Sequence, residues 1–178
     1  MMVPPPPAIA TNGSFPVVGI GASAGGLEAF SQLLRALPID SGAALVLVQH
    51  LSARHPSALS EILSRTTTMQ VSEAQDDVAV QPNQVYVIPP GKAMTIAGGY
   101  LSVQPRRGGT GLHHPIDEFF ASLAADQREC AIGVILSGTA TDGTLGLKEI
   151  KAAGGVSFAQ DASAQQDGMP SSAIASGC

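Results

Sequence analysis

The chain of 178 residues is long enough for one domain of ordinary size and too short for two. With 44% hydrophobic and 13% charged residues it can bury an aliphatic core, which excludes a disordered chain, a coiled coil and a disulfide-stapled miniprotein. The formal net charge of −5 argues against a general nucleic-acid binder, and no apolar run approaches the roughly 18 residues of a membrane span. The two cysteines form no disulfide framework, so we expect a cytoplasmic protein that inserts into no membrane.

The beginning of the chain differs from the rest. Residues 1–15 are rich in Pro and Ala and show no periodicity, which predicts a flexible leader. From residue 16 onward the pattern is that of a folded domain. We therefore expect one domain over residues 16–178.

The hydrophobic pattern of this domain predicts alternating strands and helices. In chain order we expect strands at 17–20 and 44–48 with helices at 25–36 and 56–65, strands at 85–88, 94–97 and 100–103, a helix at 115–125, a strand at 131–136, a helix at 144–153, a strand at 156–159 and a helix from 171. Short apolar strands joined by helices are typical of a parallel sheet, and Gly98-Gly99 between two β-branched runs predicts a hairpin turn. The predicted fold class is α/β: a doubly wound, mainly parallel sheet with flanking helices and an antiparallel hairpin at one edge.

The segment Gly21–Gly26, between the first strand and the first helix, is the first candidate for chemistry. Gly21-x-Ser23-x-Gly25 fits the nucleophile-elbow pattern, in which a serine on a sharp turn needs small neighbours. The same stretch also reads as a dinucleotide fingerprint, or as a turn in which Ser23 merely caps the helix. The dinucleotide interpretation requires an acidic residue at the end of the second strand. The chain has Gln49 and His50 there, which weakens this interpretation.

Two further residues lie where predicted strands end. His50 follows the second strand, and Asp142 lies in the Gly-rich loop after the strand at 131–136. Each has a plain alternative, because a loop histidine can bond to backbone and an aspartate before a helix is a common cap. The carboxyl ends of parallel strands meet at one edge, so Ser23, His50 and Asp142 together predict a nucleophile, a general base and a carboxylate that orients the base.

No metal or cofactor is expected from the sequence. His113 and His114 adjoin Asp117, but we do not expect neighbouring loop residues to converge as ligands do at helical spacing. No pair of cysteines has the spacing of a zinc site.

Several segments taken together resemble the catalytic domain of the chemotaxis protein-glutamate methylesterases (CheB). They are Gly19–Gly26, Val48-Gln49-His50, Val85–Pro90, Leu136–Gly143 and Asp167–Ile174. The resemblance implies hydrolysis of glutamate methyl esters on the cytoplasmic helices of methylated chemoreceptors, with release of methanol, and it implies glutamine deamidation as a second activity. It assigns Ser23 as nucleophile, His50 as base and Asp142 as its orienter, with no cofactor.

This chain departs from the family pattern at two positions near the proposed oxyanion site. Ala24 stands where the stand-alone enzymes usually have Thr, and Thr139 stands where they usually have Met. We expect the backbone N–H groups of Ala24 and Thr139 to form that site. The alternative is a catalytically weak regulatory or interaction module of a hybrid signalling protein.

The segment His114–Phe120 resembles the branch of the family that is fused to a receptor methyltransferase. The family normally continues beyond the position of Cys178. We therefore expect a domain truncated at its C-terminus and followed by a methyltransferase domain in the full-length protein.

Overall fold

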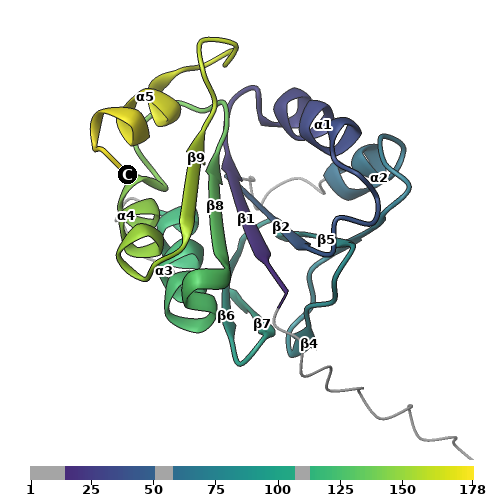
Figure 1. Ribbon diagram of the computed structural model, residues 1–178. Coiled ribbons are helices and arrows are strands. Elements are labelled where there is room, and N and C mark those ends of the chain that lie inside the picture. Colours follow the sequence, from purple (N-terminus) through teal and green to yellow (C-terminus); the bar gives the residue numbers. More distant parts are fainter. Residues whose placement is uncertain (1–14, 51–57, 107–112) are drawn as a thin grey trace, which may run out of the picture.

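The computed structural model describes residues 15–50, 58–106 and 113–178 (Figure 1). The leader expected at residues 1–15 and the start of the helix expected at 56–65 therefore lie outside the described residues, apart from Phe15. Among the described residues, no helix is both long enough and apolar enough to cross a bilayer.

The main sheet has six strands, and every pair in it is parallel. Its strands are β1 (Val17–Ala22), β2 (Ala44–Gln49), β3 (Gln70–Glu73), β5 (Gln84–Val87), β8 (Ala131–Ile135) and β9 (Val156–Ala159), in the spatial order β3-β5-β2-β1-β8-β9. The chain adds strands first on one side of β1 and then on the other. This confirms the predicted doubly wound α/β class.

Helices cover both faces of the sheet, as Figure 1 shows. One face carries α1 (Gly26–Ala36) and α2 (Leu59–Ser64), and the other carries α3 (Pro115–Gln127), α4 (Thr144–Ala152) and α5 (Gly168–Ala175). A single 3-10 turn, η1 (Arg128–Cys130), joins α3 to β8. Helix α5 begins three residues earlier than the sequence pattern indicates.

The predicted antiparallel hairpin is present, but it belongs to a second sheet and not to an edge of the main one. This sheet consists of β4 (Val78–Ala79), β6 (Lys92–Ala97) and β7 (Tyr100–Pro105), in the order β4-β7-β6. Helix α3 holds the hairpin: the Ile96 N–H donates to Ser122 Oγ at 3.1 Å, and the Gly99 N–H donates to Asp126 Oδ2 at 3.1 Å. The hairpin therefore pairs with a helix far along the chain, which no local pattern indicates.

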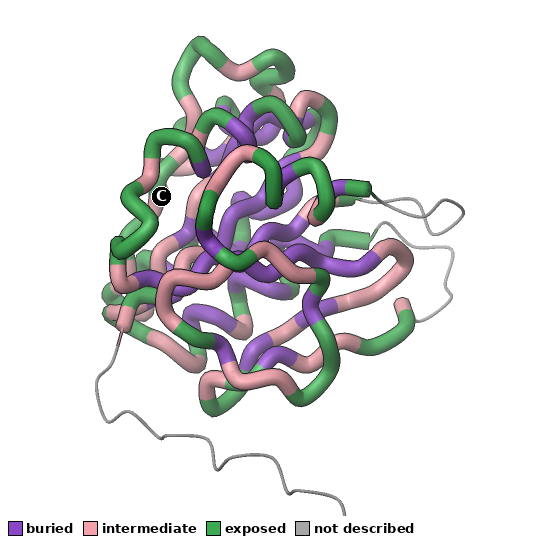
Figure 2. Tube along the Cα trace, turned by 90° about the vertical axis from the view of Figure 1, so that its right-hand side faces the viewer, coloured by how far each residue is buried: buried purple, intermediate pink, exposed green. Residues whose placement is uncertain are grey.

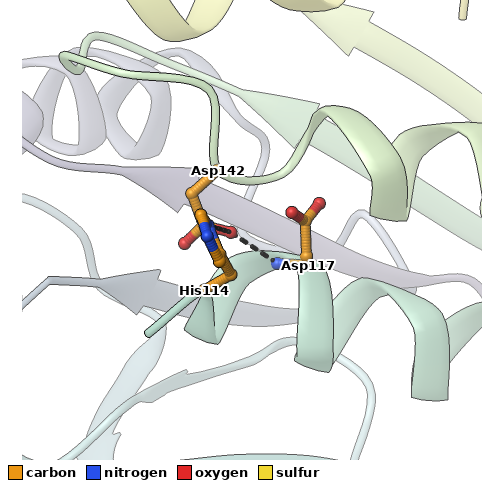
Figure 3. A group of neighbouring side chains, drawn as sticks. All are labelled: His114, Asp117 and Asp142. Atoms are coloured by element: carbon orange, nitrogen blue, oxygen red, sulfur yellow. Dashed lines mark hydrogen bonds and ion pairs between the residues drawn. The ribbon is translucent and has the colours of Figure 1, made fainter. Parts of the chain in front are cut away.

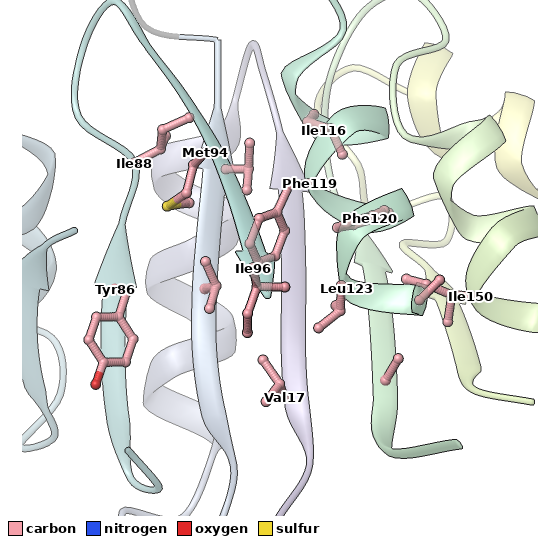
Figure 4. Close-up of a cluster of buried hydrophobic side chains, with 14 of the residues drawn as sticks. Val17, Tyr86, Ile88, Met94, Ile96, Ile116, Phe119, Phe120, Leu123 and Ile150 are labelled. Atoms are coloured by element: carbon pink, nitrogen blue, oxygen red, sulfur yellow. The ribbon is translucent and has the colours of Figure 1, made fainter. Parts of the chain in front are cut away.

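Two apolar clusters lie on the two faces of the sheet, because successive side chains of each strand point to opposite faces. In the larger cluster Phe119 of α3 lies next to Met94 and Ile96 of the hairpin, and Phe120 lies on the side of Ile150; all five side chains are buried (Figure 4). Figure 2 shows the buried parts of the chain gathered in the middle of the molecule, with exposed turns around them. The core is aliphatic with a few Phe rings, as the composition indicates.

Side chains of helix α3 pack directly on two glycines of β1. A Cβ on Gly19 would stand 2.8 Å from Phe120 Cε1, and a Cβ on Gly21 would stand 2.5 Å from Ile116 Cγ2. Both distances are shorter than real Cβ contacts, so a side chain at either position would force the α3 side chains to move away from β1. The glycines of the apparent dinucleotide fingerprint thus serve helix packing, and the nucleotide interpretation loses its main support.

Candidate active site

Ser23, His50 and Asp142 all lie at the carboxyl edge of the three central strands, β2, β1 and β8. In the parallel pairing of β1 and β2, Ala22 is the partner of Gln49. Ser23 and His50 directly follow this last pair, so both residues leave the sheet from the ends of two neighbouring strands. Asp142 comes from the loop between β8 and α4, on the other side of β1.

His50 and Asp142 form a direct pair. His50 Nε2 lies 2.7 Å from Asp142 Oδ2. The Asp142 side chain is 1% exposed, whereas that of His50 is 34% exposed. The carboxylate is therefore fixed inside the protein, and the imidazole extends from it toward the surface.

Asp142 also binds the start of helix α3. Its Oδ2 accepts the Ile116 N–H at 3.1 Å, and its Oδ1 accepts the Asp117 N–H at 2.9 Å. Burial by itself raises the pKa of the Asp142 carboxyl, but the hydrogen bonds from His50, Asp117 and Ile116 outweigh burial and hold this pKa below its ordinary value. Asp142 is thus an anion at neutral pH, held by three donors.

The structure does not support the plain interpretation in which Asp142 caps the helix that follows it. The N-cap residue of α4 is Gly143, which has no side chain to cap the helix, and Asp142 makes no bond to the first turn of α4 among the described residues. Asp142 caps α3 instead, 26 residues earlier in the chain.

The turn that carries Ser23 is held by backbone contacts. The Ser23 N–H donates to Ser137 O at 2.9 Å, and Ser23 O accepts the Gly26 N–H at 2.9 Å. Within the described part of the chain, the Ser23 hydroxyl makes no hydrogen bond, and Gly25, not Ser23, is the N-cap of α1. The Ser23 hydroxyl is therefore free for another use, and the interpretation of Ser23 as a helix cap does not hold.

The loop after β8 lies directly against Ser23. A Cβ on Gly138 would stand 3.1 Å from both Cβ and the backbone N of Ser23 and would collide with Met169 Sδ, so a larger residue here would displace the Met169 side chain. Two residues on, Ala140 has a φ of 68°, a left-handed conformation that is uncommon for alanine. Close packing at Gly138 and this bend at Ala140 turn the loop toward Asp142.

The backbone N–H groups of Ala24 and Thr139 are available for an oxyanion. Both residues are exposed, and among the described residues neither N–H donates a hydrogen bond. They lie on the two segments that meet at Ser23: Ala24 follows Ser23 in the chain, and Thr139 follows Gly138. Side-chain identity at 24 and 139 does not change these backbone donors.

Two supporting residues escaped the sequence analysis. Ser137, 1% exposed, donates from Oγ to Ala24 O at 2.7 Å and accepts the Gln166 N–H at 3.0 Å. Gln49 Nε2 donates to Ser23 O at 3.2 Å. The sequence shows Gln49 and Ser137 as polar residues at the ends of two apolar runs. That both bind the turn around Ser23 follows only from the order of the strands in the sheet.

His114, Asp117 and Asp142 come together, contrary to expectation (Figure 3). Their ligand atoms lie within 4.8 Å of one another, because the segments that lead into α3 and α4 lie side by side. The carboxylate oxygens accept backbone N–H groups of Ile116, Asp117 and Gly146. His114 Nδ1 stands 3.7 Å from Asp142 Oδ1. The two carboxylates of the cluster are thus held in place by the backbone N–H groups that they cap.

Comparisons with known proteins agree on one family. The family model described as CheB methylesterase matches residues 18–178. The protein-glutamate methylesterase FrzG of Myxococcus xanthus is 36% identical over 176 residues, and a protein-glutamate methylesterase/protein-glutamine glutaminase of Burkholderia lata is 40% identical over 185 residues. These matches cover 98% and 99% of this chain but 51% and 52% of the relatives, so the chain spans about half of their length.

A solved structure agrees with the sequence comparisons. The crystal structure of the Thermotoga maritima CheB methylesterase catalytic domain has a TM-score of 0.83 and 29% sequence identity to this chain. The likeness covers 93% of this chain and 90% of that one.

Proposed function

The chain belongs to the CheB methylesterase family, and from that premise we propose that it is a serine hydrolase that cleaves the 5-methyl esters of protein glutamates. The products are glutamate and methanol. The observation that carries the proposal is the bond between His50 Nε2 and Asp142 Oδ2, at the same edge of the sheet as Ser23, whose hydroxyl makes no hydrogen bond among the described residues.

The ionised Asp142 carboxylate can only accept, so His50 Nε2 must carry the proton in this bond. The lone pair of neutral His50 is then on Nδ1. We assign Nδ1 as the base that takes the Ser23 proton while Oγ attacks the ester carbonyl. Asp142 stabilises the imidazolium that forms.

The negative charge of the tetrahedral intermediate falls on the former carbonyl oxygen. The N–H groups of Ala24 and Thr139 stabilise it there. His50 returns the proton to the departing methoxide, which leaves as methanol, and the glutamyl group stays esterified to Ser23. A water activated by His50 then hydrolyses that ester and regenerates the serine. An amide substrate loses ammonia by the same steps, which gives glutamine deamidation.

The proposed substrates are the methylated cytoplasmic helices of chemoreceptors, and the proposed location is the cytoplasm. The resemblance of His114–Phe120 to the methyltransferase-fused branch supports a receptor methyltransferase as the partner domain in the full-length protein. No cofactor is needed for the steps above.

A regulatory module with little turnover is the second candidate, suggested by Ala24 and Thr139. Because both positions act through backbone N–H groups, the two substitutions leave the donors in place, which favours an active enzyme.

The test is methanol release from a receptor fragment carrying methyl-labelled glutamates. We expect the wild-type chain to release methanol, Ser23→Ala to release none above background, and Ser72→Ala to match wild type. Ser72 is a suitable control because it lies on β3, the far edge of the sheet. Equal release by wild type and Ser23→Ala would overturn the proposal. Tight receptor binding without release would favour the regulatory module.

A further inference from the structure

Helices α3 and α4 each begin without a side-chain cap from their own N-terminal segment. Each uses an aspartate of the other segment instead. Asp142, just before α4, accepts the Ile116 and Asp117 N–H groups of α3 at 3.1 and 2.9 Å. Asp117, in the first turn of α3, accepts the Gly146 N–H of α4 at 2.7 Å. The two helices thus exchange caps.

Gly146 makes the exchange possible. A Cβ at this position would stand 2.4 Å from Phe120 Cβ and 3.2 Å from the Asp117 backbone, so the two helices touch through bare backbone. Gly146 is buried, so its N–H depends on Asp117 and not on solvent.

The exchange includes the carboxylate that binds His50. Asp142 Oδ2 contacts both His50 Nε2 at 2.7 Å and the Ile116 N–H at 3.1 Å. Its position therefore depends on where the first turn of α3 lies relative to the loop that leads into α4. The bond from Gly146 to Asp117 joins the first turns of these two helices directly.

We propose that Asp117 is a positioning residue for the reaction: by accepting the Gly146 N–H it fixes the first turn of α4 against α3, and so holds Asp142 in line with His50. The role requires an acceptor at Asp117 Oδ1 and does not require a negative charge. This inference rests on the proposed function, since the reaction it serves is the hydrolysis at Ser23.

The experiment compares Asp117→Ala, Asp117→Asn and the control Glu118→Ala, on the neighbouring and exposed residue of the same helix. Asn keeps a side-chain oxygen for Gly146, whereas Ala does not. We expect Asp117→Ala to lower kcat by about 10- to 100-fold with little change in KM, because small misplacements of a catalytic group reduce rate strongly. Asp117→Asn is expected to stay within about threefold of wild type, and Glu118→Ala to be unchanged.

A second readout does not depend on turnover. In the free protein, the proton between His50 Nε2 and Asp142 gives a downfield NMR resonance, identified by its loss in His50→Ala. We expect this resonance to shift or broaden in Asp117→Ala and to persist in Asp117→Asn. If Asp117→Ala does not fold, Asp117→Glu replaces it, since the longer side chain misplaces the acceptor while keeping the charge.

The outcomes are distinct. Wild-type kcat with an unshifted resonance in Asp117→Ala, or in Asp117→Glu where it is used, overturns the positioning role. An Asp117→Asn variant as impaired as Asp117→Ala also overturns it, because the charge would then be required. If wild type releases no more methanol than Ser23→Ala, the proposed function fails, and the resonance still decides whether Asp117 positions Asp142.

Discussion

His50 meets Asp142 through Nε2, at 2.7 Å from Oδ2, and this leaves Nδ1 as the ring nitrogen with a lone pair. In the serine-protease triad the two nitrogens have the opposite roles. The difference follows from where the residues lie. His50 comes from one side of β1 and Asp142 from the other, so the ring spans the end of the strand that leads to Ser23.

The tautomer of His50 is directly measurable. We expect nitrogen-15 NMR of the neutral imidazole to show a protonated Nε2 and an unprotonated Nδ1, because the Asp142 carboxylate only accepts. In Asp142→Asn this preference is expected to weaken. A neutral His50 protonated on Nδ1 in the wild-type protein would contradict the proposed direction of proton transfer.

Replacing Asp142 by Asn tests the orienting carboxylate. An amide can donate to His50 and favour the wrong tautomer, and the same replacement in the serine-protease triad costs about 10⁴ in kcat. We expect a loss of about 10²- to 10⁴-fold here. The control is Asp161→Asn, an exposed aspartate beyond β9. Unchanged methanol release by Asp142→Asn would show that Asp142 only caps α3.

Asp142→Asn is also expected to reduce stability. Three donors point at its two oxygens, so the amide nitrogen must face at least one N–H group. A buried N–H left without an acceptor costs about 1–3 kcal/mol. Urea unfolding measures this loss, and a variant with the unfolding free energy of wild type would mean that the site rearranges freely.

The two aspartates give opposite pH dependences of stability. Burial and the nearby charge of Asp142 raise the pKa of the Asp117 carboxyl, and they outweigh the hydrogen bonds from Gly146 and Gly143 and the nearby His114, which lower it. A folded-state pKa above the unfolded one means that the folded protein binds the proton more tightly, so stability falls as pH rises from about 4 through that pKa. For Asp142, whose pKa is lowered, stability is present at neutral pH and is lost as pH falls below about 4.

Asp117→Asn separates these contributions, since Asn mimics the protonated side chain. We expect it to raise the unfolding free energy at pH 7 relative to wild type, and to give little difference near pH 3. Urea unfolding at several pH values checks this, with Glu118→Gln as the matched control. If the unfolding free energy of Asp117→Asn falls relative to wild type as pH rises, the ionised Asp117 stabilises the fold and the prediction is wrong.

Ala140 stores backbone strain in the loop beside Ser23. At a φ of 68° an alanine costs about 1–2 kcal/mol that glycine does not. Glycine also makes the unfolded chain more flexible, so we expect Ala140→Gly to stabilise the protein by about 0.5–1 kcal/mol net. Thermal unfolding of Ala140→Gly measures this gain in stability. A melting temperature below that of wild type would mean that contacts of the alanine methyl group outweigh the backbone strain.

The hydrophobic pattern of the sequence predicted the strands that consist of an uninterrupted apolar run. The apolar runs gave β1, β2 and β8, and their ends gave the positions of Ser23, His50 and Asp142. Strands β3 (Gln70–Glu73) and β4 (Val78–Ala79) were missed because they are short, partly exposed and lack an apolar run. Their pairing comes from neighbours elsewhere in the chain.

The contacts around Asp142 could not be predicted locally either. An aspartate next to a glycine before a helix looks like a cap for that helix, yet Asp142 caps α3 and Asp117 caps α4. The exchange depends on how closely the two helices pack at Gly146, which is a property of the folded chain.

Labelling with a fluorophosphonate tests the central claim most directly, because this reagent reacts only with a serine that an adjacent base activates. We predict that mass spectrometry finds the adduct on Ser23, that His50→Ala abolishes it, and that buried Ser137 stays unmodified. An adduct on another serine, or equal labelling of Ser23 in wild type and His50→Ala, would contradict the account.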